Sequence, residues 1–195
     1  MNVYDAILQR RAIRKYKQRP IPEETLRKLV NAARLAPQAR NLQPLKYLVV
    51  NDPKLLDDVF ACTRWAAQLS DGTPKDGERP TAYVVLLVDK EIIGSDYKGY
   101  DIDAGAAGAN LMLAAVGEGL GSCWIGSVDR ERLRAVLQIP DRYIVHTMIS
   151  LGYPAEKSVA EDAVDGSVRY YRDASGTLHV PKRPLDEVMF LNELS

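Results

Sequence analysis

The residues with the clearest chemical potential are three arginines near the N-terminus. Arg10, Arg11 and Arg14 lie close together, and six of the ten residues at positions 10–19 are Arg or Lys. The whole chain carries 26 basic and 26 acidic residues, so this positive charge is local. Guanidinium groups can grip a phosphate through paired N–H donors better than lysines can. The pattern indicates an anion site, with a solvated basic face or an arm that contacts nucleic acid as the alternatives.

A polar loop at positions 37–44 is the second candidate for ligand contacts. It is bracketed by Pro37 and Pro44, carries the amides of Asn41 and Gln43, and leads into an apolar run. Loops at the mouth of a buried strand often hold ligands. An ordinary connection between a helix and a strand is the alternative.

Composition excludes several classes of protein. The 195 residues are 46% hydrophobic, which suffices for a sizeable core in a single domain. A formal net charge of zero argues against a general nucleic-acid binder. The N-terminus has no apolar stretch typical of a signal peptide, and nowhere do the roughly 18 apolar residues of a membrane span occur. We therefore expect a soluble cytoplasmic protein with neither a nucleic-acid nor a membrane partner.

Metal and thiol chemistry have little support in the sequence. Cys62 and Cys123 are far apart, and His146 and His179 are the only histidines. No metal-ligand cluster follows from such spacing. We predict no metal site and expect both cysteines to be packed thiols.

The hydrophobic pattern predicts helices and strands that would position these residues. The first helix, capped by Asn2, should carry Arg10, Arg11 and Arg14 on about one turn of helical or near-helical backbone. Further helices are predicted from Pro22 to before Pro37, from 52 toward 65, over 103–119 and after 129. Strands are predicted at 47–50, 83–88, 122–126 and 143–151, with loops at 70–80 and 94–101. The glycines at 117–121 end a helix where a dinucleotide fingerprint would follow a strand, so we reject a Rossmann fold.

The chain changes character after residue 154. The segment from 155 is polar and turn-rich, and a hairpin is predicted around 173–176. A second cationic spot, Lys182 and Arg183, follows. The apolar ending that comes next needs a surface to cover it, and a second subunit would supply one. This ending comprises Leu185, Val188, Met189, Phe190 and Leu191.

Taken in order, these features resemble the nitroreductase family of FMN-dependent oxidoreductases. They are the arginine cluster, the Asn-x-Gln-Pro run at 41–44, the Gly-Leu-Gly-Ser-Cys-Trp-Ile-Gly run at 119–126, Gly-Tyr-Pro at 152–154 and Lys-Arg-Pro-Leu at 182–185. The resemblance implies an α+β fold in which a central mixed β-sheet is flanked by helices. It further implies one FMN-binding domain over 1–195, with 155–195 as a C-terminal arm that wraps the partner of a homodimer.

The same resemblance implies where FMN would bind, at two clefts between the subunits. The arginines would hold its phosphate and the pyrimidine edge of its ring, helped by Lys182 or Arg183. The 37–44 loop would reach the flavin, partly from the partner chain, and the backbone N–H groups of Ile125 and Gly126 would face N5 and O4. No catalytic residue is implied, because the flavin carries the chemistry. The implied cofactor-binding residues are Arg10, Arg11, Ala12, Arg14, Pro37, Gln38, Ala39, Asn41, Gln43, Trp124, Ile125, Gly126, Lys182 and Arg183.

The implied activity is transfer of hydride from NADH or NADPH through FMN to a small acceptor such as a nitro compound or quinone, by a ping-pong mechanism. Three departures from the family pattern bear on this reading. Ala12 stands where serine is frequent, 38–40 replace a serine pair, and Leu45 replaces a tryptophan. Flavin fragmentation, dehalogenation or ring oxidation on the same fold are alternatives. A binding module for a phosphate ligand or nucleic acid is the non-enzymatic alternative.

Overall fold

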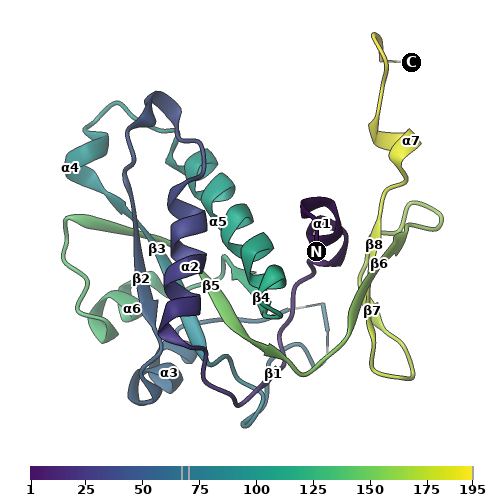
Figure 1. The fold of residues 1–195 in the computed structure, drawn as a ribbon, viewed down its shortest axis with the longest axis horizontal. Coiled ribbons are helices and arrows are strands. Elements are labelled where there is room, and N and C mark those ends of the chain that lie inside the picture. Colours follow the sequence, from purple (N-terminus) through teal and green to yellow (C-terminus); the bar gives the residue numbers. More distant parts are fainter. Residues whose placement is uncertain (67, 70, 195) are drawn as a thin grey trace.

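The protein has a central β-sheet with helices on both faces and a smaller sheet to one side (Figure 1). The computed structural model describes residues 1–66, 68–69 and 71–194. Its helices are α1 (Val3–Gln9), α2 (Glu23–Arg34), α3 (Pro53–Phe60), α4 (Lys90–Ile93), α5 (Tyr100–Gly117), α6 (Arg130–Val136) and α7 (Leu185–Val188), with a 3₁₀ turn at Ala39–Asn41. Its strands are β1 (Tyr16–Lys17), β2 (Leu45–Val50), β3 (Ala82–Asp89), β4 (Gly121–Ile125), β5 (Tyr143–Pro154), β6 (Ser158–Asp162), β7 (Tyr171–Arg172) and β8 (Leu178–Lys182).

Helices α1 and α3 begin at the caps that the sequence predicts. The Asn2 side chain accepts a hydrogen bond from the Asp5 N–H (2.9 Å), and the Asp5 carboxylate accepts one from the Asn2 N–H, which completes a capping box. Asp52 caps α3, which ends at Phe60, sooner than predicted. The chain leaves the helix there because Thr63 forms a β-bridge with Val128. The loop predicted at 70–80 has neither helix nor strand over 71–80, and residue 70 lies outside the described residues.

The central sheet is antiparallel. Its order is β1-β5-β3-β2, with β4 paired to β5, and each of these pairings is antiparallel. The α+β prediction is confirmed, but the expected mixed sheet is wrong. The parallel contact at this sheet is an isolated bridge between Ala12 and Ser122. The mixed sheet was implied by the family resemblance, and hydrophobic periodicity could not correct it, because periodicity identifies a strand but does not give its direction.

Strand β3 is buried along its whole length, as its continuous apolar run predicts. Val84, Leu86 and Val88 pack in a cluster with residues of α2 and α5 on one face. Tyr83 and Val85 pack in a second cluster with residues of α3 and α6 on the other. The sheet therefore has a hydrophobic core on each side, with α2 and α5 over one face and α3 and α6 over the other.

Helix α5 is packed closely against β4. A Cβ atom added to Gly108 would come within 1.9 Å of the Trp124 ring, so only glycine lets the indole lie this close to the helix. The helix begins at Tyr100, three residues before the predicted start. This contact fixes the position of β4 along the axis of α5.

The arm, residues 155–195, forms the second sheet in the order β6-β8-β7 (Figure 1). Strand β6 is parallel to β8, whereas β7 pairs antiparallel with β8. Tyr171 pairs with His179 and Arg172 with Leu178, which confirms the predicted hairpin. Figure 1 shows α7 projecting beyond this sheet, away from the central one.

Large apolar side chains are exposed on α1 and at the end of the arm. Val3 is 72% exposed and Tyr4 67%, while Leu185 is 67% and Leu191 73% exposed. The expectation that a partner subunit covers the apolar ending stays a prediction. None of the helices in the described part of the chain is long and apolar enough to cross a bilayer.

Candidate functional site

The arginine segment is extended. Helix α1 ends at Gln9, and its C-cap residue Arg10 already has extended backbone angles (φ −61°, ψ 115°). Ala12 bridges to Ser122 of β4, and the Ile13 N–H donates to the Ser122 carbonyl (2.9 Å). The predicted helical turn is therefore wrong, because pairing with β4 competes successfully with continuation of α1.

Extension divides the arginines between two sides. Side chains alternate along an extended chain, so Arg10, Ala12 and Arg14 face one way and Arg11 the other. Arg11 lines a separate cavity of about 650 Å³ together with Leu8. The three guanidiniums thus do not converge, and two of them share a side. The role of Arg11 toward a cofactor stays a prediction.

Arg10 and Arg14 lie on the side of β4 that carries Cys123. Burial raises the pKa of the Cys123 thiol, and the positive charges of Arg14 and Arg10 oppose that rise. Both cysteines are buried, which confirms that they are packed thiols. Cys123 was not singled out as a site residue, although it lies beneath the two arginines.

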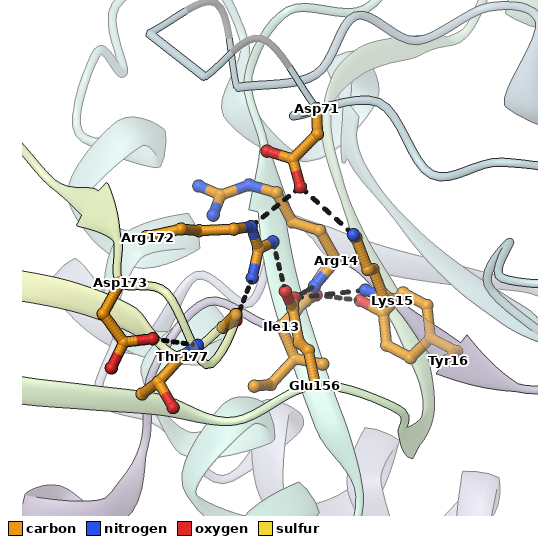
Figure 2. Close-up of polar contacts among 10 residues, drawn as sticks. Ile13, Arg14, Lys15, Tyr16, Asp71, Glu156, Arg172, Asp173 and Thr177 are labelled. Atoms are coloured by element: carbon orange, nitrogen blue, oxygen red, sulfur yellow. Dashed lines mark hydrogen bonds and ion pairs between the residues drawn. The ribbon is translucent and has the colours of Figure 1, made fainter.

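A buried carboxylate fixes the arginine segment (Figure 2). Glu156, two residues beyond β5, accepts hydrogen bonds from the backbone N–H groups of Arg14 (2.5 Å) and Lys15 (3.1 Å). Its other oxygen pairs with Arg172 of β7 at 2.5 Å. The Glu156 side chain is only 3% exposed. A carboxylate this deeply buried needs such partners.

Asp71 joins the same network from the loop before β3. It pairs with Arg172 (2.9 Å) and with Lys15 (3.1 Å), as Figure 2 shows. Burial of Asp71 opposes ionisation, but the hydrogen bond from Lys15 and the charge of Arg172 outweigh it and lower the pKa of Asp71. Segments that are distant in sequence therefore meet at the arginine segment.

Strand β4 pairs with the arginine segment at Ser122 and ends three residues later, at Ile125. Trp124 packs toward α5, so its neighbours Cys123 and Ile125 face the opposite way. The Thr147 hydroxyl donates to the Ile125 carbonyl (2.7 Å). Arg130 binds the His146 carbonyl (2.8 Å), next to a register shift in the pairing of β3 with β5. These contacts hold Ile125 and the exposed Gly126 at the strand end.

The 37–44 loop is held in a strained conformation at the other end of α5. Arg40, Asn41 and Gln43 have positive φ angles of 54°, 53° and 53°. Such left-handed conformations are costly for residues other than glycine and collect at functional sites. The Ala39 N–H donates to Asp103 (3.1 Å), a carboxylate that is 1% exposed. The strained backbone supports the prediction that the 37–44 loop contacts a ligand.

The two candidate halves do not meet within one chain. The loop is attached to α5 at Asp103, whereas Ile13 packs against Gly121, just beyond the opposite end of α5. Helix α5 has 18 residues, so it spans about 27 Å at roughly 1.5 Å per residue. The arginine segment and the loop therefore lie at opposite ends of one helix.

The cationic residues of the arm lie at the end of β8. Lys182 and Arg183 are both exposed, and Arg183 pairs with Glu187 at 3.7 Å. Their predicted contact with a cofactor phosphate stays a prediction.

The sequence reasoning missed four residues that hold the site together. Asp71, Glu156 and Arg172 form the network around Arg14, and Asp103 holds the loop. Asp103 could have been noticed as an acid within the most apolar predicted helix, since buried acids need partners. The others had no local signal, because their partners are far away in sequence.

Comparisons with known proteins agree with this architecture. The model of the nitroreductase family matches residues 7–153. A protein of Archaeoglobus fulgidus, provisionally named NADH dehydrogenase/NAD(P)H nitroreductase, is 34% identical over 163 residues, which cover 82% of this chain and 89% of the relative. An FMN-dependent nitroreductase from Clostridium difficile is 26% identical with a TM-score of 0.69, covering 97% of this chain and 98% of that one.

A third relative was solved with its cofactor. This Desulfovibrio desulfuricans protein, provisionally titled a nitroreductase, was crystallised in complex with FMN. It is 26% identical, covers 100% of this chain and 99% of its own, and has a TM-score of 0.68. The family match spans most of the chain and includes the arginine segment, the 37–44 loop and β4. The chain belongs to the nitroreductase family.

Proposed function

We propose that this protein is an FMN-dependent oxidoreductase that passes hydride from NADH or NADPH to a small acceptor such as a nitro compound or a quinone. The observation that carries the proposal is the pairing of the extended arginine segment with β4. In this pairing Ala12 bridges to Ser122, and the charges of Arg10 and Arg14 act on the neighbouring Cys123 of the strand that ends at Ile125. Family membership and the FMN complex of one relative support the same reading.

The described residues fit FMN in chemistry. Arg10 and Arg14 provide cations for a phosphate and for the electron-rich edge of a flavin. Ala12 lacks a hydroxyl, so the guanidiniums carry the phosphate contacts. Lys182 or Arg183 would add a further cation if the arm closes over the phosphate.

When bound, FMN supplies hydride acceptance and donation at N5. The chain has to bind it, orient it and stabilise the negative charge that it gains. Arg14 would favour the reduced cofactor electrostatically, and the N–H groups of Ile125 and Gly126 would orient the ring. No catalytic acid is required of the protein.

We propose further that each site is shared by two chains in a homodimer. The arginine segment and the 37–44 loop lie at opposite ends of α5, so one chain cannot close both around a single cofactor. A partner related by two-fold symmetry would bring its loop to the first chain's arginines. The exposed apolar residues of α1 and of the arm's ending would be covered in such a dimer.

The test begins with the colour of the purified protein. We expect a yellow dimer that releases one FMN per chain on denaturation and oxidises NADH or NADPH with a quinone or nitroarene. If protein covers the other flavin face, donor and acceptor have to use the same exposed face in turn, and initial-rate lines at several acceptor concentrations should then be parallel. Intersecting lines would reject the ping-pong mechanism.

Two other outcomes would change the assignment. A colourless protein that no FMN titration can fill would support a phosphate-ligand binding module. A yellow protein without NAD(P)H oxidation would point to another flavin reaction, such as fragmentation or dehalogenation.

A further inference from the structure

We infer that Glu156 and Arg172 form a buried charge pair that positions the arginine segment and sets the electrostatic potential at the cofactor. Glu156 binds backbone N–H groups of the arginine segment and Arg172 acts through Glu156, so both are positioning residues. The electrostatic half of the inference rests on the proposed function, and the positional half stands without it.

The positional role follows from what the two carboxylate oxygens do. One oxygen of Glu156 holds the N–H groups of Arg14 and Lys15, and the other meets Arg172 (Figure 2). Two successive N–H groups bound to one oxygen fix the backbone direction at Arg14, and hence the side to which its guanidinium points. The Arg14 guanidinium also lies over the ring of Tyr170, two residues before Arg172 in the arm, at 5.5 Å from the ring centre.

Arg172 makes the burial of Glu156 possible. Its side chain is 14% exposed, and it also pairs with Asp71 and donates to the Gly176 carbonyl (2.9 Å). A buried carboxylate without a cation would carry a large desolvation penalty. The arm therefore controls the arginine segment through a fixed ion pair, in addition to any contact that it makes with a partner.

The charge of Glu156 also reaches the cofactor side of β4. Its negative charge adds to the burial that raises the pKa of the Cys123 thiol, whereas Arg14 and Arg10 oppose it. Reduced FMN is more negative than oxidised FMN, so Glu156 disfavours reduction and Arg172 favours it. Removing either member of the pair should shift the cofactor's midpoint potential, and the two shifts should have opposite signs.

The experiment compares Glu156→Gln, Arg172→Gln and the double variant as purified dimers loaded with FMN. Glu156→Gln should raise the midpoint potential and Arg172→Gln should lower it, each by about 30 mV, which is a tenfold change for a two-electron couple. The double variant should return close to the unmodified protein. Glu161→Gln is the matched control, because this arm carboxylate pairs with His179 (2.6 Å) and should leave the potential unchanged.

A second measurement tests the positional role without FMN. Hydrogen exchange in the apo protein should quicken at the Arg14 and Lys15 amides in Glu156→Ala and in Arg172→Gln, while the β3 amides stay protected. Unchanged exchange at those two amides would overturn the positional role. Potentials that shift in the same direction, or not at all, would overturn the electrostatic role. If the unmodified protein binds no FMN, the proposed function and the electrostatic role fail together, and the exchange result alone decides the positional role.

Discussion

The two halves of the candidate site are held in place by different physics. The arginine segment is held by charge, since one buried carboxylate binds two of its backbone N–H groups and is itself neutralised by Arg172. The 37–44 loop is defined by its backbone conformation, because Arg40, Asn41 and Gln43 all have left-handed backbone angles.

The difference matches what each half would have to do. A phosphate and the edge of a flavin are recognised by charge, so fixed cations belong there. Side-chain amides such as Asn41 and Gln43 bind a ligand through directional hydrogen bonds. Their backbone therefore has to hold the side chains in a fixed orientation. The cost of the left-handed residues, roughly 1–2 kcal/mol each, is tolerated only because the surrounding structure enforces them.

The largest predicted effect is the recovery of FMN binding in a mixed dimer whose two chains each carry a defect in a different half of the site. We expect an Arg14→Ala homodimer to bind FMN poorly, and a homodimer with Asn41→Gly and Gln43→Gly to do the same. Glycine removes the amides and still suits the positive φ angles. A mixed dimer of the two chains would contain one site with neither defect. Differently tagged chains, purified through both tags, should therefore carry one FMN per dimer.

The mixed dimer separates a shared site from one built by a single chain. If each chain supplied both halves of its own site, every site in the mixed dimer would be damaged and the preparation would remain colourless. That result would contradict the placement of the halves at opposite ends of α5 and would require a large movement of the loop.

The next largest effect is expected from a change in the arginine segment alone, measured as the affinity for FMN. Hydrogen bonds to charged groups contribute about 1.5–3 kcal/mol each, so Arg14→Ala should weaken FMN binding by roughly ten- to a hundredfold. Fluorescence titration of the apo protein would measure it. Arg19→Ala is the control, because Arg19 belongs to the same cationic run but stacks on Tyr153 at 4.2 Å. Equal losses in both variants would show that only net positive charge matters.

Local sequence patterns predicted much of the fold for a physical reason. Strand β3 is buried on both faces and helix α2 on one, so each displays its burial in its own residues. The cap at Asn2 is likewise local. Strand direction is not local, so the sequence pattern could not correct the mixed sheet that the family resemblance implied.

The candidate site was predicted in part for the same reason. Arg10 and Arg14 were recognisable as a charged run, but the extended backbone that separates them from Arg11 depends on a bridge to Ser122. The partnership of Glu156 with Arg14 spans 142 residues, and that of Asp103 with Ala39 spans 64. Neither pairing can be predicted from the residues that surround either partner in the sequence. Resemblance to a family supplied the ordered set of site residues, yet it did not supply the residues that position them.

A smaller effect is predicted for the buried acid behind the loop. Asp103 accepts from the Ala39 N–H and from the Tyr97 hydroxyl (2.5 Å), and burial together with this bond raises the pKa of Tyr97 to about 12. Asp103→Asn should cost about 1.5–3 kcal/mol in the free energy of unfolding, measured by urea titration. Tyr97→Phe keeps the carboxylate on Ala39 and should cost less. A larger loss in Tyr97→Phe would show that the contact to Tyr97, not the one to the loop, is what Asp103 provides.

The smallest effect should have the opposite sign, because it removes strain. Arg40 has a φ of 54°, a conformation that glycine adopts without steric cost. Arg40→Gly should therefore stabilise the protein by roughly 0.5–1 kcal/mol, after the added flexibility of the unfolded chain is subtracted. Arg34→Gly is the matched control, because Arg34 lies in the last turn of α2 and the same change there should destabilise by up to about 1 kcal/mol. Thermal unfolding of the FMN-free protein would measure both. If Arg40→Gly destabilised as much as Arg34→Gly, the loop would be held by the Arg40 side chain, which lies 5.8 Å from the Tyr97 ring, and not by an imposed backbone shape.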